Sequence, residues 1–200
     1  MKPAARGFAF ETLATDGTAR AGRLTTPHGT VETPSFMPVG TQESVKTLAP
    51  DEVASTGARV VLGNTYHLML RPGAEAIARL GGLHAFTRWP HTMLTDSGGF
   101  QAYSLAVASG KGGGNGAPLV DAAEEGFRFK SHLDGSVHAL TPERAVAIQA
   151  QLGADIQMQL DVCPPADSPR AAVEEAVART TRWAKRALAA PRPEHQALFG

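Results

Sequence analysis

The sequence predicts an α/β protein built on a parallel sheet, preceded by a small antiparallel β-meander. From Pro34 onward, short apolar strands alternate with helical segments, and this alternation is typical of parallel sheets with right-handed crossovers. The strands are almost continuously apolar and end in polar residues, as strands buried on both faces do. Residues 1–33 carry hairpin signals instead. Both a doubly wound sheet and a (β/α)8 barrel fit this pattern.

Composition narrows the class of protein. The chain has 200 residues, enough for one domain with a core, and its 19 basic and 19 acidic residues leave no net charge. A basic field over the whole chain is therefore excluded as a basis for binding nucleic acid. No apolar run is long enough for a membrane span, and the N-terminal residues lack the apolar core of a secretory signal, so we expect a cytoplasmic protein. Cys163 is the only cysteine, which excludes an internal disulfide and a cysteine-rich zinc site within this chain.

The antiparallel segment is predicted from its turns. Residues 8–12 and 19–24 flank Asp16-Gly17, a strong hairpin signal, and His28-Gly29 marks a second turn before residues 30–33. We therefore assign residues 1–33 to an N-terminal antiparallel sheet.

The alternating elements follow in order from residue 34. Glycines and prolines delimit strands at 35–40, 59–63, 92–95 and 155–161, a further strand starting at 197, and helices at 50–57 and 72–80. Thr141 before Pro142 predicts the start of a third helix, with Ile148 and Leu152 on its buried face. Ser168-Pro169 predicts the start of a long fourth helix, whose buried stripe would be Val173, Val177, Ala184 and Leu188. Residues 34–200 thus supply four βα units and the start of a fifth strand. A (β/α)8 barrel needs roughly 200 to 250 residues or more, so the barrel interpretation requires that this chain is part of a longer protein.

A loop and a hairpin are inserted at residues 104–140. The run Gly-Lys-Gly-Gly-Gly-Asn-Gly at 110–116 predicts a flexible loop. A phosphate-binding loop is disfavoured, because Leu105 stands where that motif needs glycine and no serine or threonine follows Lys111. Asp134-Gly135 then predicts a hairpin.

Polar clusters follow three of the predicted strands, and in a parallel α/β fold such strand ends converge on one face. The first cluster contains Asn64, the second begins at Asp96, and the third begins at Asp161. The second cluster reads Asp96, Ser97, Gly98, Gly99, Phe100, Gln101. A carboxylate, two glycines that leave the backbone accessible to a ligand, and an aromatic ring suggest a pocket for a flat polar ring such as a nucleobase. If two carboxylates lie close together, the negative charge of one raises the pKa of the other.

Each candidate has a plainer interpretation. An aspartate at a strand end is often only a turn former, although two at successive strand ends weaken that view. His67 is better explained as a hydrogen-bonded structural residue than as a general base, and Cys163 as a small, partly buried residue than as a nucleophile. The seven histidines show no metal-binding spacing, and His28 and His84 stand isolated in the sequence.

Several motifs, in order, resemble those of the bacterial tRNA-guanine transglycosylases, the queuine tRNA-ribosyltransferase family. The matching segments are 33–41 (TPSFMPVGT), 63–73 (GNTYHLMLRPG), 81–84 (GGLH), 94–101 (LTDSGGFQ), 129–135 (FKSHLDG), 140–143 (LTPE) and 161–163 (DVC). Together they cover nearly the whole chain and resemble the N-terminal half of the family. Val162 departs from the pattern, because many relatives have an acid after the second aspartate.

The resemblance implies a TIM barrel with an N-terminal antiparallel sheet. It also implies exchange of guanine at the tRNA wobble position for 7-aminomethyl-7-deazaguanine, by double displacement, in queuosine biosynthesis. Asp96 would contact the base and manage its proton, and Asp161 would read the amidine edge with support from Gln101. Ser97, Gly98, Gly99 and Phe100 would line the pocket, with Phe100 stacking on the purine. Asn64 would hold Asp96 in the empty site, and Val39 and Leu62 would pack against ribose.

The resemblance places other parts of the enzyme beyond residue 200. These are the nucleophilic aspartate, much of the tRNA-binding surface, and three cysteines and a histidine that bind structural zinc. It further implies a homodimer. Two other interpretations remain: a non-catalytic tRNA- or base-binding subunit of the same family, and an unrelated barrel hydrolase whose two carboxylates act as an acid–base pair.

Overall fold

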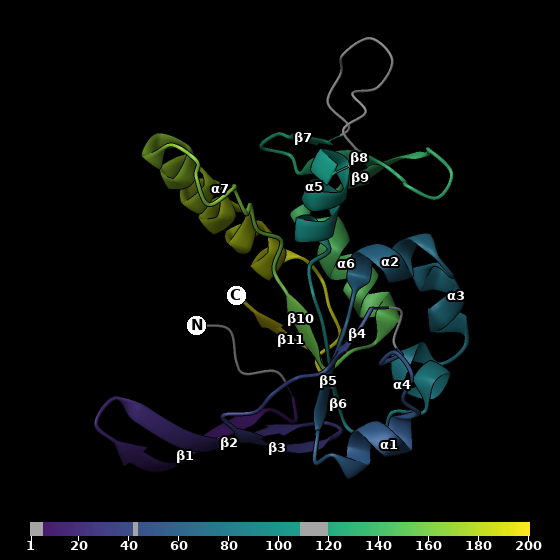
Figure 1. Cartoon of the computed structure of the whole chain (residues 1–200), viewed down its shortest axis with the longest axis vertical. Coiled ribbons are helices and arrows are strands. Elements are labelled where there is room, and N and C mark those ends of the chain that lie inside the picture. The colour runs from purple at the N-terminus through teal and green to yellow at the C-terminus, as the bar shows by residue number, and fades with distance from the viewer. Residues whose placement is uncertain (1–5, 42–43, 109–119) are drawn as a thin grey trace.

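The computed structural model describes residues 6–41, 44–108 and 120–200. The N-terminal part is an antiparallel sheet in the order β1-β2-β3, with β1 at Ala9–Asp16, β2 at Ala19–Thr26 and β3 at Gly29–Thr33. It lies across one end of the molecule (Figure 1). Gly17 occupies the β1–β2 turn with φ +57°, a conformation that glycine adopts without steric cost. The predicted meander is confirmed.

A five-stranded sheet forms the centre of the molecule, in the order β11-β10-β6-β5-β4. All four pairings in it are parallel. The strands are β4 at Val39–Gly40, β5 at Val60–Gly63, β6 at Thr92–Thr95, β10 at Ile156–Met158 and β11 at Ala197–Phe199. Their order in space follows their order in sequence. A doubly wound sheet instead reverses its strand order at a switch point, so the described sheet is singly wound.

Seven helices lie in the described residues. They are α1 at Pro50–Ser55, α2 at Thr65–Leu70, α3 at Ala74–Arg79, α4 at Gly82–Thr87, α5 at Gly99–Ala108, α6 at Pro142–Leu152 and α7 at Arg170–Ala189. The start of α6 is as predicted: the Thr141 hydroxyl accepts a hydrogen bond from the Arg144 amide at 3.2 Å, and Ile148 and Leu152 are buried. The sequence did not predict α2, α4 or α5. The first and fourth strands were also predicted too long. Only residues 39 and 40 of the first form a strand, and the fourth covers Ile156–Met158 and ends before Asp161. None of these helices is both long and apolar enough to cross a lipid bilayer.

The predicted buried stripe of α7 is wrong. Val177 is 62% exposed, and the residues that α7 buries are Ala176, Trp183 and Ala187. The Trp183 ring decides which face is buried. It packs edge-on against Phe127 with a centroid distance of 5.3 Å, and its Nε1 donates to the Glu124 carbonyl at 2.7 Å. Burying one large aromatic ring whose N–H is hydrogen-bonded stabilises the fold more than burying the smaller valines would.

Between α5 and α6 the chain forms a second antiparallel sheet, β7-β8-β9, at Val120–Ala122, Phe127–Lys130 and Val137–Leu140. Its β8–β9 turn contains the predicted Asp134-Gly135, where the Ser136 hydroxyl donates to Asp134 at 2.7 Å. The glycine-rich segment at 110–116 lies outside the described residues. In Figure 1 this small sheet lies at the end of the molecule opposite β1–β3.

One main core joins the central sheet to the helices. Its fully buried members include Leu68, Ile77, Leu83, Met93, Leu140, Leu152, Leu160 and Trp183. They come from α2, α3, α4, α6 and α7 as well as from the sheet and the β8–β9 region. This packing holds the carboxyl ends of the central strands in fixed positions, where the polar clusters lie.

Candidate functional site

Asp96 lies directly after β6 and is held by three donors. The Asn64 side-chain amide donates to its Oδ2 at 2.7 Å, and the Thr65 and Gly98 backbone amides donate to its Oδ1 at 2.8 and 3.1 Å. The Thr65 hydroxyl also donates to the Asp96 carbonyl at 2.6 Å. The side chain of Asp96 is therefore fixed in one orientation.

Asn64 connects the carboxyl ends of β5 and β6. Its carbonyl oxygen accepts from the His67 amide at 3.2 Å and so caps α2, while its amide nitrogen donates to Asp96. One residue thus starts a helix and positions a carboxylate on the neighbouring strand. The contact expected between Asn64 and Asp96 is present. The role of this contact in catalysis stays a prediction.

Asp161 is joined to the same site through Ser97. The buried Ser97 hydroxyl donates to Asp161 Oδ1 at 3.2 Å and accepts from the Gly99 amide at 3.3 Å. Asp96 and Asp161 follow β6 and β10, which pair in parallel. The structure therefore brings the two aspartates to one end of the sheet, on either side of a single serine.

The surroundings of Asp96 favour its protonated form. Burial raises the pKa of Asp96 to about 6, and the nearby Asp161 carboxylate adds to the rise, although the donors from Thr65, Gly98 and Asn64 oppose it. Since its unfolded pKa is about 3.9, the folded protein binds this proton more tightly than the unfolded chain. The contribution of Asp96 to the unfolding free energy therefore falls as the pH rises from about 4 to about 6. A carboxyl group that titrates near neutral pH is suited to both giving and accepting a proton.

We expect Asp161→Asn to lower the pKa of Asp96, because the substitution removes a nearby negative charge but keeps an oxygen for Ser97. The pKa should remain above its ordinary value, since burial is the larger cause. Carboxyl NMR of the protein with 13C-labelled aspartate would measure it. Asp167→Asn, at an exposed position, is the matched control. An Asp96 pKa that is the same in both variants would show that the two carboxylates do not interact.

Two glycines bring the backbone close to the site. Gly98 has φ +78°, and a Cβ there would lie 3.2 Å from the Tyr66 amide nitrogen. A Cβ on Gly99 would lie 2.9 Å from Leu160 Cδ1 and 3.2 Å from the Asp161 carbonyl oxygen. Side chains at these positions would push the loop away from α2 and β10. Gly98 is therefore favoured by its positive φ and by the close backbone of α2, and Gly99 by the close Leu160 side chain and Asp161 carbonyl.

Gly98→Ala should destabilise the protein more than Gly135→Ala. Both glycines have similar positive φ values, +78° and +74°, so both substitutions carry a similar backbone cost. A Cβ at Gly135 meets nothing within 4 Å, whereas one at Gly98 is crowded by α2. We expect a difference of about 1–3 kcal/mol in unfolding free energy from the crowding. Urea denaturation of both variants measures it, and equal losses would mean that the loop can move aside freely.

The remaining predicted residues lie around this centre. Phe100 is 55% exposed at the start of α5, and Gln101 beside it is half-buried. Val39 pairs in register with Leu62 on the neighbouring strand, and Val39 is 56% exposed. Strand alternation places Leu62 on the face opposite Val61, which is part of the core. An exposed ring and an apolar strip are thus available near the carboxylates.

Sequence reasoning missed Thr65, which makes two of the hydrogen bonds to Asp96. Its position after the helix-capping Asn64 was the available signal. Behind it, the buried Tyr66 hydroxyl hydrogen-bonds His132 Nδ1 at 3.0 Å. Burial, and secondly His132, lowers the pKa of His67. The His67 ring packs edge-on against the Tyr66 and His132 rings. Ring packing, rather than the predicted side-chain hydrogen bond, supports a structural role for His67.

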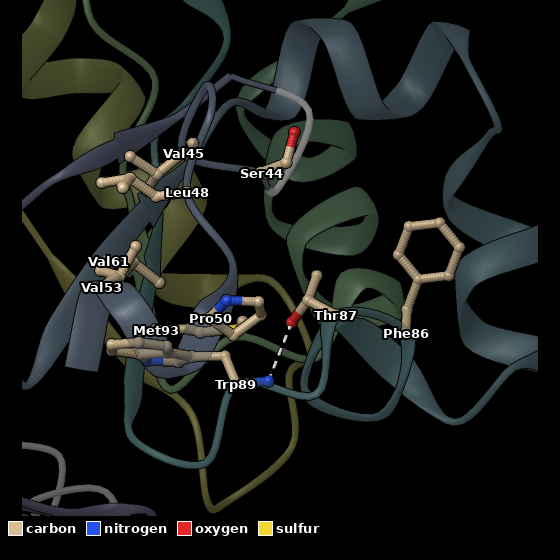
Figure 2. A pocket seen from close by; sticks show the side chains of 11 residues that line it. Ser44, Val45, Leu48, Pro50, Val53, Val61, Phe86, Thr87, Trp89 and Met93 are labelled. Carbon is tan, nitrogen blue, oxygen red and sulfur yellow. Dashed lines mark hydrogen bonds between the residues drawn. The ribbon is translucent and has the colours of Figure 1, made fainter. Parts of the chain in front are cut away.

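An apolar hollow lies elsewhere among the described residues. It has a volume of about 280 Å³ and is enclosed by α1, the end of α4 and the core-facing side chains of β5 and β6, including Val61 and Met93 (Figure 2). Trp89 forms one wall, and its amide donates to the Thr87 hydroxyl at 3.2 Å. None of the lining residues is charged. This hollow therefore lacks the carboxylates that lie beside Ser97.

Only one group of described residues could hold a metal ion: His28, His84 and Asp155. The expectation that His28 and His84 are isolated is therefore wrong, because residues distant in sequence meet when the meander packs on the central sheet. The prediction that Cys163 is partly buried is also wrong: it is exposed, and it belongs to no such group of described residues. A zinc site of three cysteines and a histidine does not fit the residues of this chain.

The fold and site together define a mixed α/β protein with a pair of carboxylates at the carboxyl edge of a parallel sheet, which is where α/β proteins bind small ligands. Comparison with known families then identifies the chain. The family model described as queuine tRNA-ribosyltransferase matches residues 15–200. The chain belongs to this family.

Curated relatives support the same assignment. Proteins named queuine tRNA-ribosyltransferase from Sorangium cellulosum, Herpetosiphon aurantiacus and Desulforudis audaxviator are 67%, 51% and 53% identical to this chain. The alignments cover 97%, 96% and 97% of this chain, but 46%, 46% and 50% of the relatives. The chain therefore spans about half the length of the curated relatives that it matches.

Proposed function

We propose that the full-length protein is a tRNA-guanine transglycosylase, a pentosyltransferase that replaces guanine at the wobble position of tRNA by 7-aminomethyl-7-deazaguanine. Family membership supports this activity. The observation that carries the proposal is that Asp161, which bonds the hydroxyl of the residue next to Asp96, lies close enough for its charge to raise the pKa of Asp96. This arrangement provides two carboxyl groups for the polar edges of one purine.

We assign the roles by chemistry. A purine between the two aspartates would expose its N1–H and 2-amino donors to Asp161, a carboxylate that accepts hydrogen bonds. Asp96, with a pKa of about 6, would exchange a proton with the base as it leaves or enters. The exposed ring of Phe100 would stack on the purine, and Gln101 would support Asp161. Val39 and Leu62 would contact ribose.

The covalent step needs a group that this chain does not supply. In a double displacement, a carboxylate attacks C1′ of the ribose, the bond from C1′ to guanine breaks, and the incoming base then displaces the carboxylate. We propose that this nucleophile lies beyond residue 200, together with the structural zinc ligands and most of the tRNA-binding surface. The zero net charge of this chain supports the proposal that most of the tRNA-binding surface lies beyond residue 200.

The same proposal covers architecture and assembly. Residues 1–33 would form one domain, and residues 34–200 the first part of a TIM barrel with an insertion at 104–140. The sequential strand order supports the barrel, because a barrel adds each strand beside the last. We further propose a cytoplasmic homodimer. Leu48 and Phe86, each more than 40% exposed beside the apolar hollow, are apolar surface that a second copy could cover.

The test is base exchange by the full-length protein. Incubation with wobble-guanine tRNA and labelled guanine should incorporate label into tRNA, and unlabelled 7-aminomethyl-7-deazaguanine should displace it. Binding of guanine and tRNA without incorporation would instead identify a non-catalytic subunit. Cleavage of a sugar substrate with no specific purine binding would identify a barrel hydrolase. Either outcome would overturn the proposal.

A further inference from the structure

Three side chains from separate parts of the chain meet at the end of the central sheet opposite Asp96. His28 lies in the β2–β3 turn, His84 lies in α4, and Asp155 immediately precedes β10. His28 Nδ1 is 2.7 Å from Asp155 Oδ1, and His84 Nε2 is 3.2 Å from Asp155 Oδ2. One donor atom from each residue lies within 4.8 Å of the other two. We propose that these residues form a zinc site that fastens the N-terminal sheet to the central sheet.

The hydrogen bond on the far side of His84 is the strongest support. Its Nδ1 lies 3.0 Å from the Trp89 carbonyl, which can only accept, so Nδ1 carries the proton. The other ring nitrogen, Nε2, faces Asp155 and is the atom that could bind a metal ion. Histidines that bind metals commonly donate their other N–H to a backbone carbonyl in this way, which fixes the ring and its tautomer.

His84 Nε2 is buried, makes no hydrogen bond of good geometry to the described residues, and lies 3.2 Å from Asp155 Oδ2. A cation shared by these two atoms, either a proton or a metal ion, would pair them. Ligands at about 2.0–2.2 Å from a tetrahedral zinc are about 3.4 Å apart, close to the observed separation.

Asp155 is prepared to act as an anionic ligand. It is 2% exposed, and its Oδ2 also accepts from the Met93 amide at 2.9 Å. Its Oδ1 faces His28 and its Oδ2 faces His84, so the carboxylate lies between the two imidazoles. Two imidazoles and one carboxylate are a donor set that suits zinc.

His28 provides the entrance and completes the site. Its side chain is 39% exposed, so an ion and a fourth water ligand can enter from that side. The His28 ring stacks on His84 with a centroid distance of 3.5 Å and an angle of 16°. Two protonated rings would repel at this distance, so one shared cation suits the group better. To bind it, His28 must exchange its hydrogen bond to Asp155 for a bond to the ion, by turning its ring out of the stack.

The position of the group indicates a structural role. Next to it, the buried Thr26 and Thr92 hydroxyls hydrogen-bond at 2.8 Å between β2 and β6, and Trp89 Nε1 donates to the Thr92 carbonyl. An ion held by His28, His84 and Asp155 would cross-link the same junction. This end of a parallel α/β sheet serves stability, whereas the carboxyl end holds the ligand site.

The test compares zinc content in four forms of the full-length protein, grown with added zinc and analysed by elemental mass spectrometry. His28→Ala and His84→Ala should each contain one zinc less per chain than the wild type. His195→Ala, which removes an exposed histidine outside the group of three, should match the wild type. Any zinc bound beyond residue 200 cancels in this difference.

A second measurement uses zinc alone as the probe. After treatment with a chelator, added zinc should raise the melting temperature of His195→Ala more than that of His28→Ala, and His28→Ala should bind zinc at least about tenfold more weakly. His28 is exposed, so His28→Ala decides the matter if His84→Ala does not fold. Equal zinc content and equal zinc response in all forms would overturn the proposal, and the three residues would then share only a proton.

Discussion

Replacing Asp96 by alanine in the full-length protein is expected to abolish base exchange. The substitution removes the carboxyl group that titrates near pH 6 and leaves the Asn64, Thr65 and Gly98 donors without their acceptor. Loss of a general acid–base group typically costs about 10²- to 10⁴-fold in rate. Incorporation of labelled guanine into tRNA measures the effect.

The control for this experiment is Asp167→Ala, at an exposed position away from the site. It should retain wild-type turnover. Because Asp96→Ala also removes hydrogen bonds, its melting temperature should be measured, and Asp96→Asn, which preserves the shape of the side chain, provides a second variant. Turnover close to wild type in Asp96→Asn would remove Asp96 from the chemistry.

Asp161→Ala is expected to weaken guanine binding by about 2–3 kcal/mol, roughly 30- to 150-fold, because donors on the base would be buried without an acceptor. Isothermal titration with guanine measures the loss. Ser97→Ala is the matched comparison, since it removes the hydroxyl that holds Asp161 but keeps the carboxylate. We expect a smaller loss for Ser97→Ala. An unchanged dissociation constant in Asp161→Ala would contradict the role given to Asp161.

The sequence predicted the elements that local signals determine. The hairpin at Asp16-Gly17, the start of α6 at Thr141 and the apolar strands of the central sheet all agree with the structure. It did not predict α2 or α5, because glycines, polar residues and aromatic residues after a strand are equally typical of a loop. These short helices depend on tertiary contacts, such as the side-chain bond from Asn64 to Asp96 across neighbouring strands.

The stripe of α7 and the group at Asp155 show two further limits of sequence reasoning. Periodicity favoured the valines of α7, but Trp183 is buried because Glu124 and Phe127 lie opposite it, and those residues are about sixty positions away. His28 and Asp155 are 127 positions apart. Spacing along a chain cannot reveal a contact that forms only when the N-terminal sheet packs against the central sheet.

The three donors around Asp96 have a bearing on how a base can bind. Its oxygens are already occupied by Asn64, Thr65 and Gly98 before a ligand arrives. Oδ1 accepts two of these bonds and Oδ2 only one, so a single lone pair, on Oδ2 beside the Asn64 amide, is left for a nucleobase. Any base that binds here would therefore have one direction of approach to this carboxyl group, set by the place of Asn64.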